Sequence, residues 1–395
     1  MRTVVPCPDC GAPVPIPLVQ IVKGDSADVT TIFCRNCMWT GGDEIFKSGG
    51  RYALVVWGGE EIVADTRHPY VFVPVTEAAS LNSRINALTN GGTIWLEQGN
   101  YAAAGDITVS NSNVVIRGVG MSSTILGGSV LIEAGVVRLQ DLAVRATGKA
   151  YGVKLYTSSG AGTPRCEIRN VWIGASSVGA GNGPDKGLWL DGAILTVVDH
   201  CTIAFNNHSG LYVNTSDTVA PIASTNMNTF RDCTFNGNGR YGVEIEVGVD
   251  AVAGMMGHRF VGGNMESNTL GEFSADNATF IAIQGVDFEC GIDHTGGQII
   301  SISASQPVLI EDCNFVISQP NPPGTAVAVT RFFLITNCGD AHVRRCRLST
   351  DGVATWVQGA VGVFTEGCTG CTEQDNILSP AGAGRYISNR GRMRT

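Results

Sequence analysis

The chain has 395 residues, of which 44% are hydrophobic and 15% are charged, and its formal net charge is −9. The apolar content suffices for a large core, whereas the negative net charge argues against a protein that binds nucleic acid. No apolar run approaches the ~20 residues of a membrane span, and the first ten residues lack the apolar core of a signal peptide, so we expect folding in a cytosol.

Two CxxC pairs lie near the start of the chain, Cys7 with Cys10 and Cys34 with Cys37. Two such pairs complete the tetrahedral four-sulfur site that is typical of structural zinc, with a redox pair or an iron centre as the alternatives. The segment from about residue 4 to 45 resembles a zinc ribbon, a rigid module that binds a partner. We therefore predict a zinc-ribbon-like module over residues 1–50 and a strand with a linker over residues 51–76.

An internal repeat with steps of 23 to 33 residues dominates the rest of the sequence. Each unit has a central residue, a second apolar residue two positions later and a third three positions earlier. The central residues are Val119, Leu142, Val171, Cys201, Cys233, Gly263, Val286, Cys313 and Cys346. The later residues are Met121, Val144, Ile173, Ile203, Phe235, Met265, Phe288, Phe315 and Leu348; the earlier ones are Ile116, Leu139, Ile168, Val198, Phe230, Phe260, Ile283, Ile310 and Val343.

The spacing of these positions predicts a parallel β-helix. A gap of two follows strand alternation, whereas a gap of three requires a bend between two inward residues. The residues at the bend are Gly118, Asp141, Asn170, His200, Asp232, Gly262, Gly285, Asp312 and Arg345. Seven of these nine are Gly, Asn or Asp, which tolerate left-handed backbone conformations. Successive rungs would stack about 4.8 Å apart.

The recurring cysteines are interpreted as core residues of this coil. Cys201, Cys233, Cys313 and Cys346 are expected to face inward as inert packing, because cysteine is often buried. Cys166, Cys290 and Cys338 are expected in the core or at corners, and Cys368 with Cys371 on a last, irregular rung. A second metal site or a catalytic thiol is the alternative. Asn206, Asn238 and Asn268 recur at one position and are expected to form a ladder of stacked amides.

The start of the coil resembles the pectate-lyase-like superfamily. The resemblance rests on a short amphipathic helix around 81–88, then "GGTIWLEQGNY", then "NVVIRGVG". It implies an all-β, right-handed, single-stranded parallel β-helix over residues 77–379, followed by a basic tail over 380–395. This fold hosts lyases, hydrolases, esterases and inert virus spikes, so it implies no particular activity. "VVDHCTIAF" is similar to a pectate-lyase stretch, but the other catalytic motifs are missing and His200 is expected to be a corner residue.

The candidate site lies on the outer face of one strand of each rung. Alternation in "GLWLDG", "GLYVN" and "GVEIEV" predicts one outward column of Trp189, Tyr212 and Glu244 and a second of Asp191, Asn214 and Glu246. Aromatic rings beside acids are typical of sugar sites, so Trp189, Asp191, Tyr212 and Asn214 are ligand-binding candidates. Glu244 and Glu246 are catalytic candidates, because paired carboxylates can cleave a glycosidic bond. A solvated outer face or a subunit contact is the alternative.

Three functions remain open from the sequence. The first is a phage virion spike or tailspike, anchored through the zinc-binding module to other virion proteins and recognising a host surface polysaccharide. The second is a capsid-decorating protein without a ligand, and the third is a polysaccharide lyase or glycoside hydrolase. The sequence favours a protein that is not an enzyme, located at the virion surface. We expect a homotrimer, because a single coil leaves its ends and outer faces uncovered.

Overall fold

The computed structural model describes residues 70–156, 165–177, 182–214, 225–246, 256–290, 298–317, 331–350, 367–380 and 385–387, preceded by seven short strands. These strands are β1 (Arg2–Pro6), β2 (Pro13–Pro17), β3 (Thr30–Phe33), β4 (Thr40–Asp43), β5 (Ile45–Phe46), β6 (Tyr52–Trp57) and β7 (Glu60–Asp65). They pair in antiparallel fashion as β1–β2, β3–β4 and β5–β6–β7. Cys7, Cys10, Cys34 and Cys37 lie outside the described residues, so the zinc site stays a prediction.

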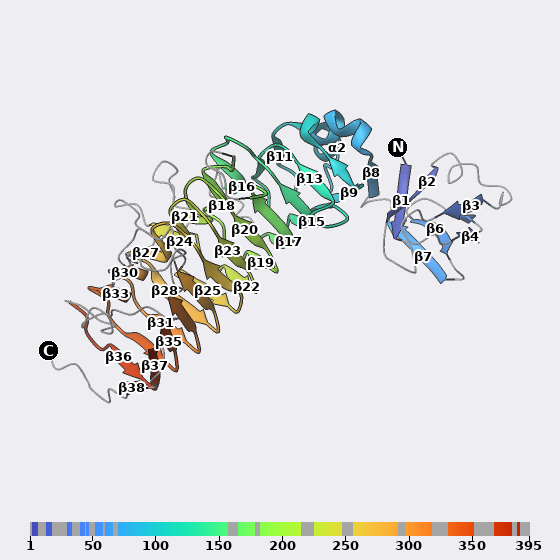
Figure 1. Cartoon of the computed structure of the whole chain (residues 1–395). Helices are drawn as coiled ribbons and strands as arrows, with labels where there is room; N and C mark the ends of the chain where they lie inside the picture. Colours follow the sequence, from blue (N-terminus) through green and yellow to red (C-terminus); the bar gives the residue numbers. More distant parts are fainter. Residues whose placement is uncertain are drawn as a thin grey trace.

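From Tyr70 onward the chain winds into a coil whose rungs follow one another in sequence order (Figure 1). A nine-stranded parallel sheet, the short sheet, forms one wall. Its strands are β11 (Ile107–Val109), β14 (Val130–Ile132), β16 (Tyr151–Tyr156), β18 (Lys186–Asp191), β21 (Leu211–Asn214), β24 (Tyr241–Glu246), β27 (Gly271–Asp276), β30 (Gln298–Ser303) and β33 (Arg331–Thr336).

A second sheet of 22 strands, the long sheet, completes the rungs, most of them with two strands separated by a corner and two of them with a single bent strand, β15 or β17. Its strands up to the sixth short-sheet strand are β8 (Tyr70–Val73), β9 (Gly92–Leu96), β10 (Gly99–Asn100), β12 (Val114–Arg117), β13 (Thr124–Leu126), β15 (Arg138–Val144), β17 (Glu167–Gly174), β19 (Val197–Asp199), β20 (Thr202–Ala204), β22 (Thr229–Arg231) and β23 (Thr234–Asn236). The later strands are β25 (Met256–Val261), β26 (Asn264–Glu266), β28 (Thr279–Gln284), β29 (Asp287–Cys290), β31 (Val308–Glu311), β32 (Asn314–Ile317), β34 (Ala341–Arg344), β35 (Arg347–Thr350), β36 (Thr372–Gln374), β37 (Asn376–Pro380) and β38 (Arg385–Ile387).

The inward columns of the coil are those that the repeat predicts, from the second unit onward. In register, Ile168, Val198, Phe230 and Phe260 stack on successive rungs, and all are at most 2% exposed. The flat rings of Phe230 and Phe260 lie 4.7 Å apart with an interplanar angle of 8°. Burial of these apolar columns is the main favourable contribution to the stability of the coil.

The first unit of the predicted repeat was assigned the wrong register. Val119 is 42% exposed and Met121 is only half-buried, so neither belongs to an inward column. Leu126 pairs with Val144 and is fully buried, as is Thr124 two residues before it. The bend after Arg117 is therefore longer than in later rungs, and the apolar pair in "GVGM" imitates the repeat without contributing to the core.

Left-handed corners bend the long-sheet segment of most rungs, as predicted; the corners at Asp141 and Asn170 lie within the continuous strands β15 and β17. Eight of the nine predicted corner residues have a positive φ between 48° and 64°, with Gly118 as the exception. A residue of this conformation turns the chain sharply while it keeps the flanking residues directed into the core. Asp141, Asn170 and His200, with φ values of 54°, 51° and 51°, occupy this position on three consecutive rungs.

The corners also explain why cysteine recurs directly after them. The Cys201 thiol lies 3.3 Å from the carbonyl oxygen of Asp199, and the Cys233 thiol lies 3.3 Å from that of Arg231. Cys313, Cys338, Cys346 and Cys371 make the same contact with the carbonyl two residues earlier. Cysteine fits this position because it is small and apolar and yet donates a weak hydrogen bond to a carbonyl at the bend.

A short helical segment covers the beginning of the coil. The 3-10 helix η1 (Val75–Ser80) leads into α2 (Leu81–Asn86), which lies beside β11 at that end of the coil, and a 3-10 turn η2 (Ala102–Ala104) follows (Figure 1). Leu81 and Ile85 are fully buried, as expected for a capping helix. At the other end β38 pairs in antiparallel fashion with β37. None of the described helices is long and apolar enough to cross a membrane.

The buried thiols should behave as inert packing. The hydrogen bond with Cys201, together with burial, raises the pKa of Cys233 well above its ordinary value. We expect Cys233→Ala to lower the free energy of unfolding by about 1–2 kcal/mol. The native protein should label with iodoacetamide at Cys201, Cys233, Cys313 and Cys346 only after unfolding; rapid labelling of any of the four in the folded state would contradict this packing.

Candidate functional site

The outer face of the short sheet carries the predicted columns in the predicted register. Trp189 pairs with Tyr212 and Tyr212 with Glu244, while Asp191 pairs with Asn214 and Asn214 with Glu246. The inward neighbours Leu188, Leu190, Leu211, Val213, Val243 and Ile245 are fully buried. Together with side chains that contact them, the columns form what we call the Glu244 cluster: Lys154, Lys186, Trp189, Asp191, His208, Ser209, Tyr212, Asn214, Arg240, Glu244 and Glu246.

The aromatic rings of the cluster do not form the bare platform that the sequence suggests. Trp189 and Tyr212 lie edge to face, with centroids 5.8 Å apart and an interplanar angle of 74°. The Lys154 ammonium lies 3.6 Å from the Trp189 ring centroid, and Lys186 lies 4.8 Å from both rings. Cation–π contacts of this kind hold the rings and the ammonium groups in place together. The face therefore offers cations and aromatic edges side by side.

Glu244 is buried although it lies on the outer face, since it is only 1% exposed. Arg240 reaches one of its carboxylate oxygens at 3.1 Å, and the Ser209 hydroxyl donates to the other. His208 lies 3.5 Å from the same carboxylate through Nδ1, while its Nε2 lies 3.1 Å from the Arg240 guanidinium. An arginine only donates, so Nε2 accepts and the proton of the neutral imidazole sits on Nδ1.

The cluster shifts the pKa values of three of its groups. Burial raises the pKa of Glu244 to about 7, against the opposing effects of Ser209 and Arg240. Burial and the nearby Arg240 lower the pKa of His208, and burial with the hydrogen bond to Glu246 raises that of the Tyr212 hydroxyl. Near pH 7 the protonated and the ionised form of Glu244 are therefore both populated, while Tyr212 keeps its proton, which it donates to Glu246 over 2.7 Å. A carboxyl with this pKa suits proton transfer.

The other predicted residues are engaged within the cluster. Asp191 is 4% exposed and pairs with Lys154 at 2.9 Å, while its second oxygen, Oδ1, has no hydrogen-bond partner among the described residues. Asn214 accepts a hydrogen bond from the Trp189 indole at 2.8 Å. All six predicted residues thus come together on three rungs, and their roles in binding or catalysis stay predictions.

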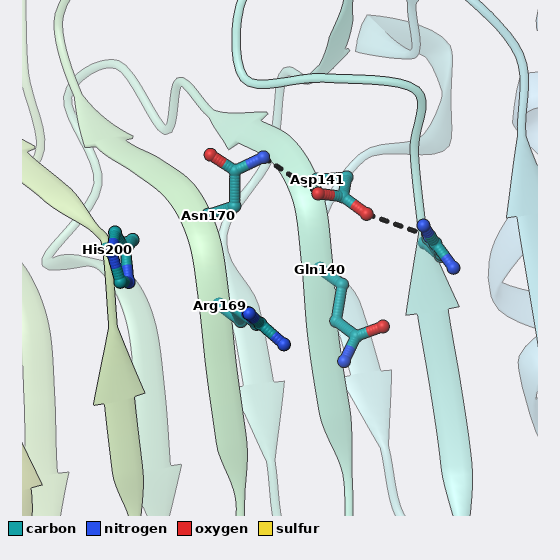
Figure 2. A pocket seen from close by; sticks show the side chains of 6 residues that line it. Gln140, Asp141, Arg169, Asn170 and His200 are labelled. Atoms are coloured by element: carbon teal, nitrogen blue, oxygen red, sulfur yellow. Dashed lines mark hydrogen bonds and ion pairs between the residues drawn. The ribbon is translucent and has the colours of Figure 1, made fainter. Parts of the chain in front are cut away.

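A second polar site lies on the outer face of the long sheet. An open pocket of about 400 Å³, which we call the corner pocket, is lined by Arg117, Gln140, Asp141, Arg169, Asn170 and His200. Figure 2 shows Asp141 joined by dashed lines to Asn170 and to an unlabelled side chain of the preceding rung. The latter is Arg117, whose Nε lies 2.8 Å from Asp141; Asn170 donates to the other carboxylate oxygen at 2.7 Å.

His200 joins the corner pocket to a group that can ligate a metal ion. Its ring lies 3.1 Å from Asp199 and 3.8 Å from Asp232, and one ligand atom from each of the three lies within 4.8 Å of the others. His200 and Asp232 are exposed, and exposed carboxylates need no metal. The corner role predicted for His200 is confirmed by its positive φ of 51°.

Several residues of these sites were missed from the sequence. Lys186 belongs to β18 together with Trp189, and Lys154 lies on β16, where it pairs with Trp189 and the alternation in "YGVKLY" already directs it outward. His208, Ser209 and Arg240 precede the strands, where alternation carries no information. The corner pocket was missed because its residues come from separate rungs, and because the sequence explains three of them, Asp141, Asn170 and His200, as bends.

The comparisons with known proteins agree with this fold. A family model described as "Right handed beta helix region" matches residues 81–254. No curated protein matches the chain. The parallel pairing of strands across successive rungs agrees with the β-helix architecture that this description names over the matched residues.

Solved structures with low identity are similar over most of the chain. ORF18 of Geobacillus virus E2 is 14% identical, with 87% of this chain and 72% of that one covered at a TM-score of 0.45. A mannuronic acid specific polysaccharide family 6 lyase from human gut microbiota is 11% identical, with 79% and 86% covered and a TM-score of 0.48. The Dettilon tailspike protein is 10% identical, with 78% and 62% covered and a TM-score of 0.47.

Proposed function

We propose that the protein is a β-helical spike of a phage particle that recognises a bacterial surface polysaccharide through the Glu244 cluster. The N-terminal module would bind zinc and anchor the coil to other virion proteins, and the coil would present its faces to the cell surface. The proposal includes a homotrimer, and the molecular mass of the isolated protein in solution tests it. The proposed ligand is a class of molecule, the polysaccharides of the host surface.

The observation that supports binding is the alignment of the cluster along the coil axis. Trp189, Tyr212 and Glu244 occupy one column on consecutive rungs, and Asp191, Asn214 and Glu246 occupy the next. Rungs about 4.8 Å apart repeat on nearly the same scale as the pyranose units of an extended glycan. The face also supplies aromatic edges, donors and acceptors together, and each sugar hydroxyl needs both a donor and an acceptor.

The test of this proposal is a binding panel. The intact protein is added to immobilised capsular and O-antigen polysaccharides from a range of bacteria, with unrelated plant glucans as the control surface. We expect selective binding to one or a few bacterial polysaccharides. Absence of binding to every polysaccharide of a broad panel would contradict recognition and favour a decorating protein without a ligand.

A second candidate function is a polysaccharide depolymerase of the lyase type, which the Glu244 carboxyl favours. Its pKa of about 7 lets it give or take a proton at neutral pH; the Arg240 guanidinium lies 3.1 Å from it, and Tyr212 is its partner in register on the preceding rung. Incubation with the polysaccharide that binds should then release unsaturated oligosaccharides, which absorb in the ultraviolet. Chain length unchanged after prolonged incubation would leave binding as the function and exclude depolymerisation of that glycan.

The proposed zinc site makes a separate prediction. Elemental analysis of the reduced, native chain should find one zinc per polypeptide, and Cys34→Ser should release it, because three thiolates leave the tetrahedral site incomplete. The variant should lose the N-terminal module to limited proteolysis while residues 77–379 remain resistant. Native protein purified without chelators and free of zinc would contradict the proposal.

A further inference from the structure

We propose that the corner pocket is a second carbohydrate-binding site, which holds one short stretch of the same polysaccharide along the long sheet. This inference rests on the proposed function and extends it to a separate face of the coil. The pocket is built from the outward residue and the corner residue of successive rungs, namely Gln140 with Asp141 and Arg169 with Asn170, with His200 on the next rung (Figure 2).

The chemistry of the lining favours a polyhydroxylated ligand. Arg117 Nε lies 2.8 Å from Asp141, and Arg169 Nε lies 3.4 Å from Asp199. Each guanidinium has further N–H donors. Gln140 and Asn170 each carry an amide with both donors and an acceptor. The pocket therefore presents donors and acceptors within one concavity. An inorganic anion would use only the donors, whereas vicinal sugar hydroxyls use both kinds of group.

The geometry of the corners holds this lining in place. Asp141, Asn170 and His200 share a left-handed backbone conformation on three consecutive rungs, so their side chains project from equivalent positions. The contacts of Asp141 with Arg117 on the preceding rung and with Asn170 on the following rung join three rungs to one another. The Arg117 guanidinium also lies 4.8 Å from the centroid of the buried Trp95 ring, which supports it from below. Groups fixed in this way lose little conformational entropy on binding.

The balance of charge distinguishes this site from an anion site. Arg117 is paired with Asp141, and Arg169 with Asp199, so the two cations are largely neutralised by carboxylates of the same face. A ligand held by hydroxyl hydrogen bonds should bind with little dependence on salt, whereas an anion would be displaced as the Debye length shortens. The pocket spans four rungs, or three steps of about 4.8 Å and roughly 14 Å along the axis, which accommodates a short oligosaccharide.

The experiment uses the full chain, oligosaccharides prepared from the polysaccharide that the wild-type protein binds, and isothermal titration. The variants are Arg169→Ala and Gln140→Ala. The matched control is Arg231→Ala, because Arg231 is an exposed arginine two rungs further along the same outward column and outside the pocket. Arg169 is 58% exposed, so its loss should leave folding intact.

We expect Arg169→Ala to weaken binding about tenfold and Gln140→Ala a few-fold, as loss of one or two ligand hydrogen bonds does. Arg231→Ala should bind as wild type, and the affinity should change less than about threefold between 0.05 and 0.5 M NaCl. Wild-type affinity in both pocket variants, together with weaker binding in Tyr212→Phe, would overturn the second site and leave the proposed function standing. Binding that sodium sulfate abolishes would assign the pocket to an anion instead. A wild-type chain that binds no polysaccharide would contradict the proposed function itself.

Discussion

Replacing Asn238 with alanine is expected to lower the free energy of unfolding by about 3 kcal/mol, because several buried polar groups then lose their partner. The Asn238 side chain accepts hydrogen bonds from the backbone N–H and the side chain of Asn206 at 3.2 and 2.7 Å. It donates to the Asn268 carbonyl oxygen at 2.8 Å and to the Ile203 backbone carbonyl at 3.3 Å. The three amides thus form the ladder that the sequence predicts, with at most 2% exposure each.

The matched control for this prediction is Asn236→Ala, two residues earlier in the same rung. Asn236 is half-buried on the outer face and bonds to the Glu266 side chain, so its loss should cost about 0.5 kcal/mol or less. Urea unfolding of both variants at one pH, with the slope compared to that of the wild type, measures the difference. Equal midpoints for Asn238→Ala and Asn236→Ala would show that the ladder does not hold the rungs together.

Glu244→Gln is expected to change the pH dependence of stability by about 3 kcal/mol between pH 4.5 and 8. The pKa of Glu244 is about 7 in the folded state against 4.5 as the ordinary value. Between pH 4.5 and 7 the Glu244 carboxyl is protonated in the folded state and ionised in the unfolded state. Its contribution to the free energy of unfolding is therefore fully present below pH 4.5. It is lost as the pH rises through 7, and the shift corresponds to about 3 kcal/mol. Glutamine does not titrate and should remove this loss.

The measurement is the free energy of unfolding of the wild type and of Glu244→Gln at several pH values from 4.5 to 8. The variant should gain stability relative to the wild type as the pH rises, and the gain should level off above about pH 7.5. His258 also titrates in folding, but it is present in both proteins and cancels in the difference. His208 contacts the Glu244 carboxylate, so any change in its titration is part of the measured difference. A constant difference across this range would place the pKa of Glu244 near its ordinary value and remove the basis for proton transfer.

The fold was largely predictable because each rung repeats the same physical requirement. Inward positions must be apolar, and a corner in the long sheet must be left-handed. Both requirements select residue types that recur at a fixed spacing in the sequence. The failure at Val119 and Met121 has the same origin, since an apolar pair after a glycine satisfies the pattern in a longer bend. The role of the cysteine thiol at the corner carbonyl depends on a bond distance that no residue pattern contains.

The candidate sites were only partly predictable. The alternation of apolar and polar residues placed Trp189, Tyr212 and Glu244 on one face. The same alternation predicts that outward residues are exposed to solvent. The burial of Glu244 results from Ser209 and Arg240, which reach it from positions outside the alternating strands. Contacts between rungs depend on side-chain direction across about 30 residues of intervening sequence, as for Asp141 with Asn170, and the spacing of one unit does not encode them.

Recognition of the polysaccharide by the short-sheet face can be tested by titration of paired variants. Tyr212→Phe with Glu246→Gln removes a hydroxyl and a charge without changing side-chain size, and Ser301→Ala alters the same outward column two rungs beyond Glu244. Titration of each protein with oligosaccharide from the bound polysaccharide should show at least about a tenfold loss for the double variant and none for Ser301→Ala. Equal affinity of the double variant and the wild type would contradict recognition through this face.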